Sequence, residues 1–323
     1  WASPRLPETI TVPEIISFTD ATGSVVTIET PVKSIISLNP GLTEVICALG
    51  GEGLIIGRDE NSIFPKSVLD KPVVAANSYR PNLELIIEKN PDVLVADTML
   101  SYNKDALKTL KEAGITVIIE LSNNSTRLKN FVYYMGLALG NPERASVILD
   151  YINRYENLVL SRVGGLKEDQ KPRVYIEWHS AWRSFGRGSA SHQNIIAAGG
   201  LNIAAEFNIT SPTLSPEYVV ERNPEVILVM IPAEQKGKLE GFIAVRNEIL
   251  SRPELAYTAA VREGRVYVYD SVITQGLRYP VGLLYWAKWF HPALFNDVDP
   301  GQVHTELISM LFGETLEGVY VYP

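Results

Sequence analysis

The sequence predicts an α/β protein with two Rossmann-like lobes, which have parallel-sheet cores and are joined by a single long α-helix. Three observations support this prediction. Short β-branched segments alternate with longer amphipathic ones, which is typical of parallel strands joined by helical crossovers. This alternation stops at one long helical pattern near residue 141 and then resumes. A chain of 323 residues also exceeds what one hydrophobic core usually serves.

The pattern divides the chain into four parts. Residues 1–30 begin with a proline-rich stretch and hold the first strand, and we expect them to be the remnant of a tether whose targeting segment has been removed. Residues 31–140 form the N-terminal α/β lobe. Residues 141–165 form the bridging helix, with Asn141 as N-cap, Pro142 in the first turn and a length of roughly 30 Å. Residues 166–323 form the C-terminal α/β lobe.

One sequence unit occurs in both lobes. PNLELIIEKNPDVLV begins at residue 81 and SPEYVVERNPEVILV begins at residue 215. Aligned at Glu84 and Glu217, they share two glutamates, an Asn-Pro pair and a valine. Asn82 and Ser215 are the predicted N-caps, and Asn-Pro ends each helix before a strand. The residues expected to form the buried stripe of the first helix are Leu83, Ile86 and Ile87.

Composition argues against several classes of function. The net charge is -8 and no run of Lys and Arg stands out, so we expect no nucleic acid partner. No apolar stretch reaches the roughly 18 to 20 residues that span a bilayer, so a soluble chain is expected. The single cysteine, Cys47, lies in an apolar run and is predicted to be buried and inert. No motif indicates catalytic residues, a resident metal or a cofactor.

Aromatic and cationic residues gather after the ends of predicted strands, where open α/β sheets bind ligands. Arginines bind carboxylate, phosphate or oxyanion groups, and flat rings stack on a large organic ligand. We therefore predict a ligand cleft between the lobes. The residues predicted to line it are Tyr79, Arg80, Trp178, His179, Trp182, Arg183, Arg187, Arg278 and Tyr279.

Five motifs in a fixed order resemble a known family. They are TDATGSVVTIETPVKSIISLNPGLTEVICALG, PNLELIIEKNPDVLVAD, SFGRGSASHQNIIAAGGLNIA, SPEYVVERNPEVILV and RYPVGLLYWAKWFHP. The chain is similar to the extracytoplasmic substrate-binding proteins of ABC importers for iron–siderophore complexes, haem and vitamin B12. The resemblance implies a protein without enzymatic activity that catches a ligand between its lobes with a small hinge motion. It also implies a place in the periplasm or at the outer face of the cytoplasmic membrane, with anchoring through a tether.

The resemblance assigns a partner to the repeated glutamates. In this family one surface glutamate on each lobe contacts arginines of the ABC transporter permease dimer, and the motifs place these at Glu84 and Glu217. An acidic residue in a first turn also stabilises its helix by roughly 0.3 to 1 kcal/mol. Both roles are compatible. The helix dipole does not explain why the same helix start occurs in both lobes, whereas a permease with two related halves would need such a pair.

The ligand implied first is a ferric-siderophore-type iron complex, because Arg183, Arg187 and Arg278 suit an anionic chelate. Vitamin B12 is an alternative, since Tyr79 matches one of two aromatic positions expected for corrinoid binding, whereas Ser211-Pro212 occupy the other. Haem would use an axial His or Tyr such as His179 or Tyr279. A small oxyanion such as molybdate is another alternative. A Rossmann-type enzyme is the alternative from another class.

Overall fold

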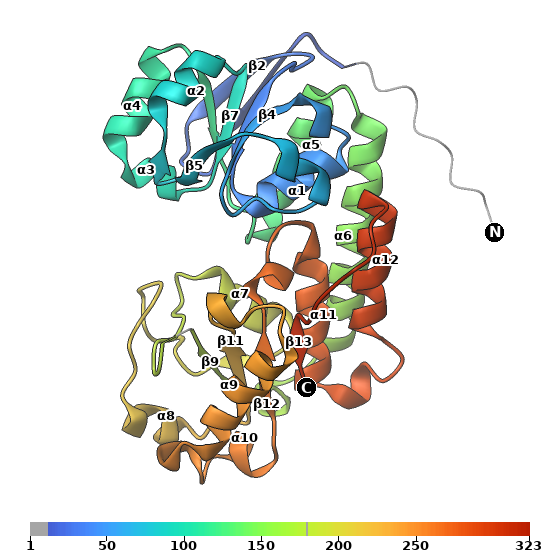
Figure 1. Cartoon of the computed structure of the whole chain (residues 1–323). Coiled ribbons are helices and arrows are strands. Elements are labelled where there is room, and N and C mark those ends of the chain that lie inside the picture. The colour runs from blue at the N-terminus through green and yellow to red at the C-terminus, as the bar shows by residue number, and fades with distance from the viewer. Residues whose placement is uncertain (1–11, 179) are drawn as a thin grey trace, which may run out of the picture. The chain divides into compact units, whose positions relative to one another are not determined.

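The computed structural model describes residues 12–178 and 180–323. The chain divides into two compact units, Trp1–Ile152 and Asn153–Pro323. Each unit holds a mostly parallel sheet with helices, which confirms the predicted fold class (Figure 1). The predicted long helix is α6, Pro142–Val163, which is 22 residues long and contains the division between the units.

The first unit is built on a six-stranded sheet of order β6-β5-β4-β3-β7-β8. Only β6 runs antiparallel to its neighbour. A two-stranded hairpin lies outside this sheet, within the segment for which one strand is predicted. The strands are β1 (Ile15–Thr19) and β2 (Val25–Glu29) of the hairpin, and β3 (Ile35–Leu38), β4 (Ile55–Asp59), β5 (Val73–Asn77), β6 (Arg80–Pro81), β7 (Val93–Ala96) and β8 (Thr116–Ile119) of the sheet.

Helices cover both faces of the first sheet because its central strands are apolar on both sides. In β3 and β7 every residue is buried. Ile86, Leu100 and Leu110 of three helices pack on one face, and α1 and α5 lie on the other side of the sheet in Figure 1. The helices are α1 (Pro40–Ala48), α2 (Leu83–Lys89), α3 (Met99–Tyr102), α4 (Lys104–Glu112) and α5 (Ser125–Ala138).

The second unit has a five-stranded sheet of order β10-β9-β11-β12-β13, in which only β13 is antiparallel to its neighbour. Its strands are β9 (Arg173–Glu177), β10 (Leu201–Asn202), β11 (Val226–Met230), β12 (Val266–Tyr269) and β13 (Val321–Tyr322). Val219, Phe242 and Ala260 bring three helices onto one face. The helices are α7 (Ala190–Ala197), α8 (Pro216–Arg222), α9 (Leu239–Ser251), α10 (Ala259–Arg262), α11 (Tyr279–Phe290) and α12 (Pro300–Phe312).

Each sheet has a point where the strand order reverses. In the first unit the chain runs from β3 outward to β4 and β5, then returns to β7 on the other side of β3. In the second unit it runs from β9 to β10 and returns to β11 on the other side of β9. Ligands of open α/β sheets bind beyond the carboxyl ends of the two strands that flank such a point. The residues after β3 and β7, and those after β9 and β11, are therefore the candidate positions for a ligand site.

One detail of the predicted α2 is wrong. Ile86 is fully buried, but Ile87 is 37% exposed, and Leu83 and Leu85 are the partly buried neighbours. Successive helical residues are about 100° apart, so Leu85 and Ile87 lie at equal angles on either side of Ile86. Spacing therefore does not distinguish them, and the packing of the helix covers Leu85 in part while it leaves Ile87 exposed.

Candidate functional site

The two copies of the repeated unit have the same local geometry. The helices α2 and α8 are both seven residues long. The side chains of Asn82 and Ser215 accept a hydrogen bond from the backbone N–H three residues on, which confirms both predicted N-caps. Asn90 and Asn223 end the helices in the left-handed conformation, with φ of 44° and 43°. Because each asparagine is followed by proline, neither helix can continue, and a buried strand begins in both cases.

Glu84 and Glu217 occupy the same position in these helices. Each is the second residue after the N-cap and each is exposed. Among the described residues neither carboxylate has a hydrogen-bond or ion-pair partner. The positive end of the helix dipole favours a carboxylate at this position, but no side chain in the described part of the chain uses its oxygens. The two glutamates are therefore equivalent, solvent-facing acceptors, one on each unit.

At the switch point of the first sheet, two polar side chains meet. Asn39 follows β3 and Asp97 follows β7, and Asn39 Nδ2 donates to Asp97 Oδ2 over 3.0 Å. The other carboxylate oxygen of Asp97 accepts from Ser78 Oγ and from the N–H of Met99. Sequence reasoning missed all three side chains because they are neither aromatic nor cationic. Their position directly after apolar strands was the available signal.

Tyr79 and Arg80 lie next to this pair. Tyr79 follows Ser78, is 44% exposed, and its carbonyl accepts from Asn103 Nδ2 over 2.8 Å. The backbone N–H of Arg80 donates to Asn77 Oδ1 over 3.1 Å, while its exposed guanidinium has no partner among the described residues. An exposed ring and an unpaired cation thus lie beside the polar switch point of the first unit.

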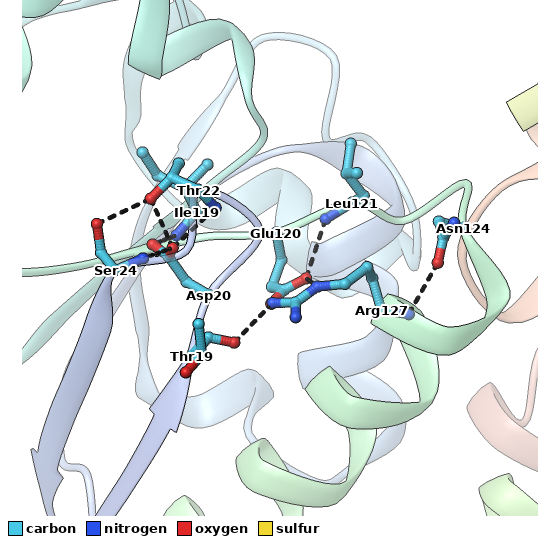
Figure 2. A network of polar contacts seen from close by, with 9 residues as sticks. All are labelled: Thr19, Asp20, Thr22, Ser24, Ile119, Glu120, Leu121, Asn124 and Arg127. Atoms are coloured by element: carbon cyan, nitrogen blue, oxygen red, sulfur yellow. Dashed lines mark hydrogen bonds and ion pairs between the residues drawn. The ribbon is translucent and has the colours of Figure 1, made fainter. Parts of the chain in front are cut away.

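A second polar group in the first unit is structural (Figure 2). Glu120 follows β8 and is only 1% exposed, and its carboxylate forms an ion pair with Arg127 of α5. Arg127 also donates to the carbonyl of Thr19 over 2.8 Å. Burial raises the pKa of Glu120, and the hydrogen bond and charge of Arg127 oppose that rise. The pair is satisfied within the protein, so it joins the hairpin, β8 and α5 rather than a ligand.

Asp20 closes the turn of the hairpin beside this pair (Figure 2). One carboxylate oxygen accepts from the backbone N–H groups of Thr22, at 2.8 Å, and Ser24, at 3.1 Å. The other oxygen accepts from the N–H of Ile119, the last residue of β8, at 3.3 Å. The N–H of Ala21 donates to the carbonyl of Ile119 over 2.8 Å. The turn is thus fixed to the end of an edge strand.

In the second unit, the loop after β9 pairs with a distant loop. Backbone hydrogen bonds join residues 182–187 to residues 207–214, and Arg183 forms an isolated bridge with Thr213. Gly186 is required at this pairing, since a Cβ there would collide with the carbonyl oxygens of Phe207 and Ile209. The pairing gives the loop a fixed path at the switch point between β9 and β11.

Trp178 and Arg183 lie together in this loop. The Arg183 guanidinium carbon is 4.8 Å from the centroid of the Trp178 ring. Arg183 Nε donates to Ser211 Oγ over 2.9 Å, and its terminal nitrogens have no partner among the described residues. Phe185 packs against Trp178 with ring centroids 5.7 Å apart. An arginine held at one nitrogen and stacked on a ring presents its remaining donors in a fixed orientation.

Trp182 is partly buried and packs against the core of the second unit. Its φ is 65°, and its backbone N–H donates to Glu177 Oε2 over 2.9 Å. Its ring packs against Tyr175 and lies under the guanidinium of Arg252, whose carbon is 4.8 Å from the ring centroid. A tryptophan in the left-handed region is strained by roughly 1 to 3 kcal/mol, so the surrounding contacts must hold it there. Trp182 therefore shapes the loop.

The other sequence-predicted site residues have different surroundings. Arg278 and Tyr279 are 3% and 5% exposed, and Arg278 packs against Tyr320 and His304. Arg187 donates from Nε to the carbonyl of Ala205 over 2.9 Å, away from Trp178. His179 lies outside the described residues. Of the set predicted for the second unit, Trp178 and Arg183 are thus the pair that the structure brings together at the switch point.

The described ranges contain neither a metal-binding cluster nor a membrane-spanning helix. No group of three or more His, Cys, Asp or Glu side chains there could hold a metal ion. Cys47 is buried, as predicted, and burial raises the pKa of its thiol to about 12. No helix in these ranges is long and apolar enough to cross a membrane.

The comparison with family models agrees with this geometry. The model for the periplasmic binding proteins matches residues 35–273, which include both switch points and both repeated helices. The chain belongs to this family. Family membership agrees with the fold class predicted from the sequence and establishes a binding role. It does not identify the ligand.

Two curated relatives of this periplasmic binding protein carry informative names. It is 25% identical over 293 residues to YvrC of Bacillus subtilis, an uncharacterized ABC transporter substrate-binding lipoprotein, with 87% of each chain covered. It is 24% identical over 220 residues to a cobalamin-binding protein of Halobacterium salinarum, with 67% of this chain and 58% of the relative covered.

Solved structures share the fold of this periplasmic binding protein at low sequence identity. The TroA-like periplasmic binding protein FepB of Veillonella parvula superposes with a TM-score of 0.78 at 23% identity, covering 95% of this chain and 99% of its own. The molybdate-binding protein MolA of Haemophilus influenzae gives 0.77 at 17% identity, covering 94% and 100%.

Proposed function

We propose that this protein is an extracytoplasmic solute-binding protein that captures a metal chelate of the ferric-siderophore type and delivers it to an ABC transporter permease, without chemical turnover. Family membership supports the binding role. The Bacillus subtilis relative, named as an ABC transporter lipoprotein, supports both the transport role and a membrane anchor at the outer face of the cytoplasmic membrane. The observation that carries the proposal is the equivalence of Glu84 and Glu217.

The docking step follows from that equivalence. Both glutamates are exposed, both lie in the first turn of a capped helix of the same length, and neither is used by another side chain of the described residues. A permease dimer presents two related surfaces, and each needs a matching contact. Charge-assisted hydrogen bonds from arginine to carboxylate are short and directional, so such a pair fixes orientation as well as affinity.

The ligand step uses the residues at the two switch points. We propose that Tyr79 and Arg80 of the first unit, and Trp178 and Arg183 of the second, contact the ligand. Arg80 and Arg183 both have unpaired terminal nitrogens among the described residues, which suits the anionic oxygens of a ferric chelate. Tyr79 and Trp178 supply ring faces for the organic part of the chelate.

A corrinoid is the second candidate, because one relative is named a cobalamin-binding protein. Tyr79 is exposed and could cover one face of a corrin ring. At the corresponding place in the second unit, Pro212 is buried and Ser211 is hydrogen-bonded to Arg183, so no aromatic side chain is available there. This difference favours the ferric chelate.

Thermal unfolding with a ligand panel tests the proposal. The panel contains ferric hydroxamate and ferric catecholate chelates, their iron-free forms, cobalamin, haem and molybdate. A true ligand at 100 times its dissociation constant stabilises the folded state by about 2.7 kcal/mol. We expect a ferric chelate to raise the unfolding temperature and its iron-free form to raise it less. A shift with cobalamin alone would replace the chelate by the corrinoid, and no shift with any compound would remove the transport proposal.

A further inference from the structure

A pocket lies in the second unit, beside the amino end of β9. It has a volume of about 350 Å³, and three arginines line it, namely Arg173, Arg187 and Arg222. Arg173 is the first residue of β9 and pairs in register with Leu201 of β10, which also lines the pocket. Trp178 follows the other end of the same strand, roughly 16 Å away at about 3.3 Å per residue. Arg187 comes from the same loop after β9 as Arg183, so the pocket uses the far end of that loop, whereas its other two arginines lie outside the loop.

Each of two arginines is fixed through its Nε atom. Arg173 Nε donates to the carbonyls of Arg222, at 3.0 Å, and Asn223, at 3.1 Å. Arg187 Nε donates to the carbonyl of Ala205 over 2.9 Å. These bonds use the inner nitrogen of each guanidinium and tie the side chains to the backbone on both sides of the pocket. The outer nitrogens, which form the planar fork that binds oxyanions, are not consumed by them.

The positive charge of the pocket is only partly balanced. Arg222 pairs with Glu206 at 3.1 Å, and Arg173 lies 3.4 Å from Glu225. Arg187 has no carboxylate partner among the described residues. One full positive charge therefore stays uncompensated inside a concave surface, although the protein as a whole carries a net charge of -8. A concave site of one sign concentrates field lines and attracts ions of the other sign.

We propose that this pocket binds a phosphate group, either as inorganic phosphate or as the phosphate of an anionic lipid headgroup. Guanidinium groups bind phosphate through two parallel N–H···O bonds, and three of them converge on one small volume here. The apolar side chains of Leu201 and Ile203 also line the pocket, so it can hold a small substituent beside the phosphate. None of the pocket residues is among the four proposed to contact the transported ligand or the two proposed for docking. Arg187, which the sequence predicts to line the ligand cleft, is assigned to this pocket instead.

Titration of the whole protein at low ionic strength tests the proposal. Calorimetry with inorganic phosphate detects the soluble source, and flotation with phosphatidylcholine vesicles, with and without phosphatidylglycerol, detects the lipid source. We expect Arg187→Gln to weaken binding by at least about tenfold, since it removes the uncompensated charge and its hydrogen bonds. Glu206→Gln should tighten binding, because it removes the only carboxylate that lines the pocket among the described residues.

Arg262→Gln is the matched control. Arg262 is an exposed arginine of the same unit, at the end of α10, with no partner among the described residues. It should bind phosphate as the wild type does, and all three variants should show the circular dichroism spectrum of the wild type. Binding to vesicles alone assigns the lipid source, and binding to phosphate alone assigns the soluble one. No binding of either probe by the wild type, or equal affinity in Arg187→Gln and Arg262→Gln, overturns the proposal.

Discussion

Arg252 and Glu177 form a two-point ion pair in the interior of the second unit. Arg252 Nη1 lies 2.7 Å from Glu177 Oε2, and Nη2 lies 3.0 Å from Oε1. The two side chains are 10% and 4% exposed. Glu177 also accepts from the hydroxyl of Tyr175, at 2.6 Å, and from the N–H of Trp182, at 2.9 Å. One carboxylate thus connects α9, β9 and the loop that carries Trp178 and Arg183.

Removal of one partner should strongly destabilise the unit. In Arg252→Leu, Glu177 keeps its buried charge without a counterion, so we expect a loss of about 3 to 5 kcal/mol in the free energy of unfolding. Arg222→Leu breaks an exposed pair with Glu206, whose side chains are 46% and 54% exposed, and should cost less than about 1 kcal/mol. Urea denaturation measures both. Similar losses in the two variants would contradict the interior role of the Arg252 pair.

The two left-handed asparagines should respond differently to glycine. Among the described residues Asn90 has no side-chain partner, whereas Asn223 Oδ1 accepts from the N–H of Ala259 over 2.9 Å. Asn90→Gly relieves an unfavourable φ in the folded state but makes the unfolded chain more flexible. Because these effects oppose each other, the free energy of unfolding should change by less than about 1 kcal/mol. Asn223→Gly also loses a hydrogen bond and should cost about 1 kcal/mol more. Equal changes in urea denaturation would show that the Ala259 contact contributes nothing.

The docking pair should affect uptake but not ligand affinity. We expect Glu84→Ala combined with Glu217→Ala to abolish transport in cells or proteoliposomes, with an unchanged dissociation constant for the ligand. Loss of two first-turn carboxylates should lower stability by about 0.6 to 2 kcal/mol in total. The control is Glu88→Ala combined with Glu221→Ala, which alters exposed glutamates in the last turns of the same helices. Weaker ligand binding in the first double variant would place its residues in the ligand site instead.

Acid should destabilise the second unit through His304. Its ring is 1% exposed, lies 4.8 Å from the Tyr320 ring, and has Nε2 3.4 Å from Arg278 Nη1. Burial, with the nearby charge of Arg278, lowers the pKa of His304 to about 3. The unfolded chain takes up this proton at its ordinary pKa of about 6.5, so stability is present above that pH and is lost as pH falls toward the folded value.

The variant His304→Gln isolates this effect. It cannot take up the proton, so its free energy of unfolding should fall less steeply between about pH 6 and pH 4, by up to about 1.4 kcal/mol per pH unit. The wild type and the variant share all other histidines and carboxylates. The difference between their slopes of unfolding free energy against pH therefore reports His304. Parallel stability profiles would show that this residue titrates normally.

Arg183 should contribute to ligand affinity through its free nitrogens. With an anionic ferric chelate, Arg183→Gln should raise the dissociation constant by about tenfold or more, because one charge-assisted contact is lost. The exposed Arg262→Gln serves as control and should leave the constant unchanged. Fluorescence quenching of tryptophan follows both titrations. An unaltered constant in Arg183→Gln would move the ligand away from the β9 loop.

The repeated helices are predictable because their determinants are local. Asn82, Ser215 and the Asn-Pro stops act within one or two turns of the chain, so spacing alone gives both ends of each helix. The wrong assignment of Ile87 has a simple origin. In a seven-residue helix the apolar pattern is too short to define which side faces the sheet, and the packing of Ile86 decides it.

The candidate site is less predictable because its loops are placed by distant partners. The pairing of residues 182–187 with 207–214 fixes where Arg183 and Arg187 lie, and no local pattern encodes that pairing. The same is true of Arg278, whose burial depends on α12. The order of residues in the sequence shows that cationic and aromatic residues follow the ends of predicted strands. Only the folded chain shows which of them share a surface.

The contact between Asp20 and Ile119 has a further consequence for the first unit. The strand β8 is an edge of its sheet and reads Thr-Val-Ile-Ile, a short β-branched sequence of the kind that recruits the edge of another molecule. The hairpin turn occupies both the N–H and the carbonyl of Ile119, so the last pairing position of this edge is closed to a second chain. Beyond supporting the fold, the turn thus blocks the pairing of another strand at this end of β8.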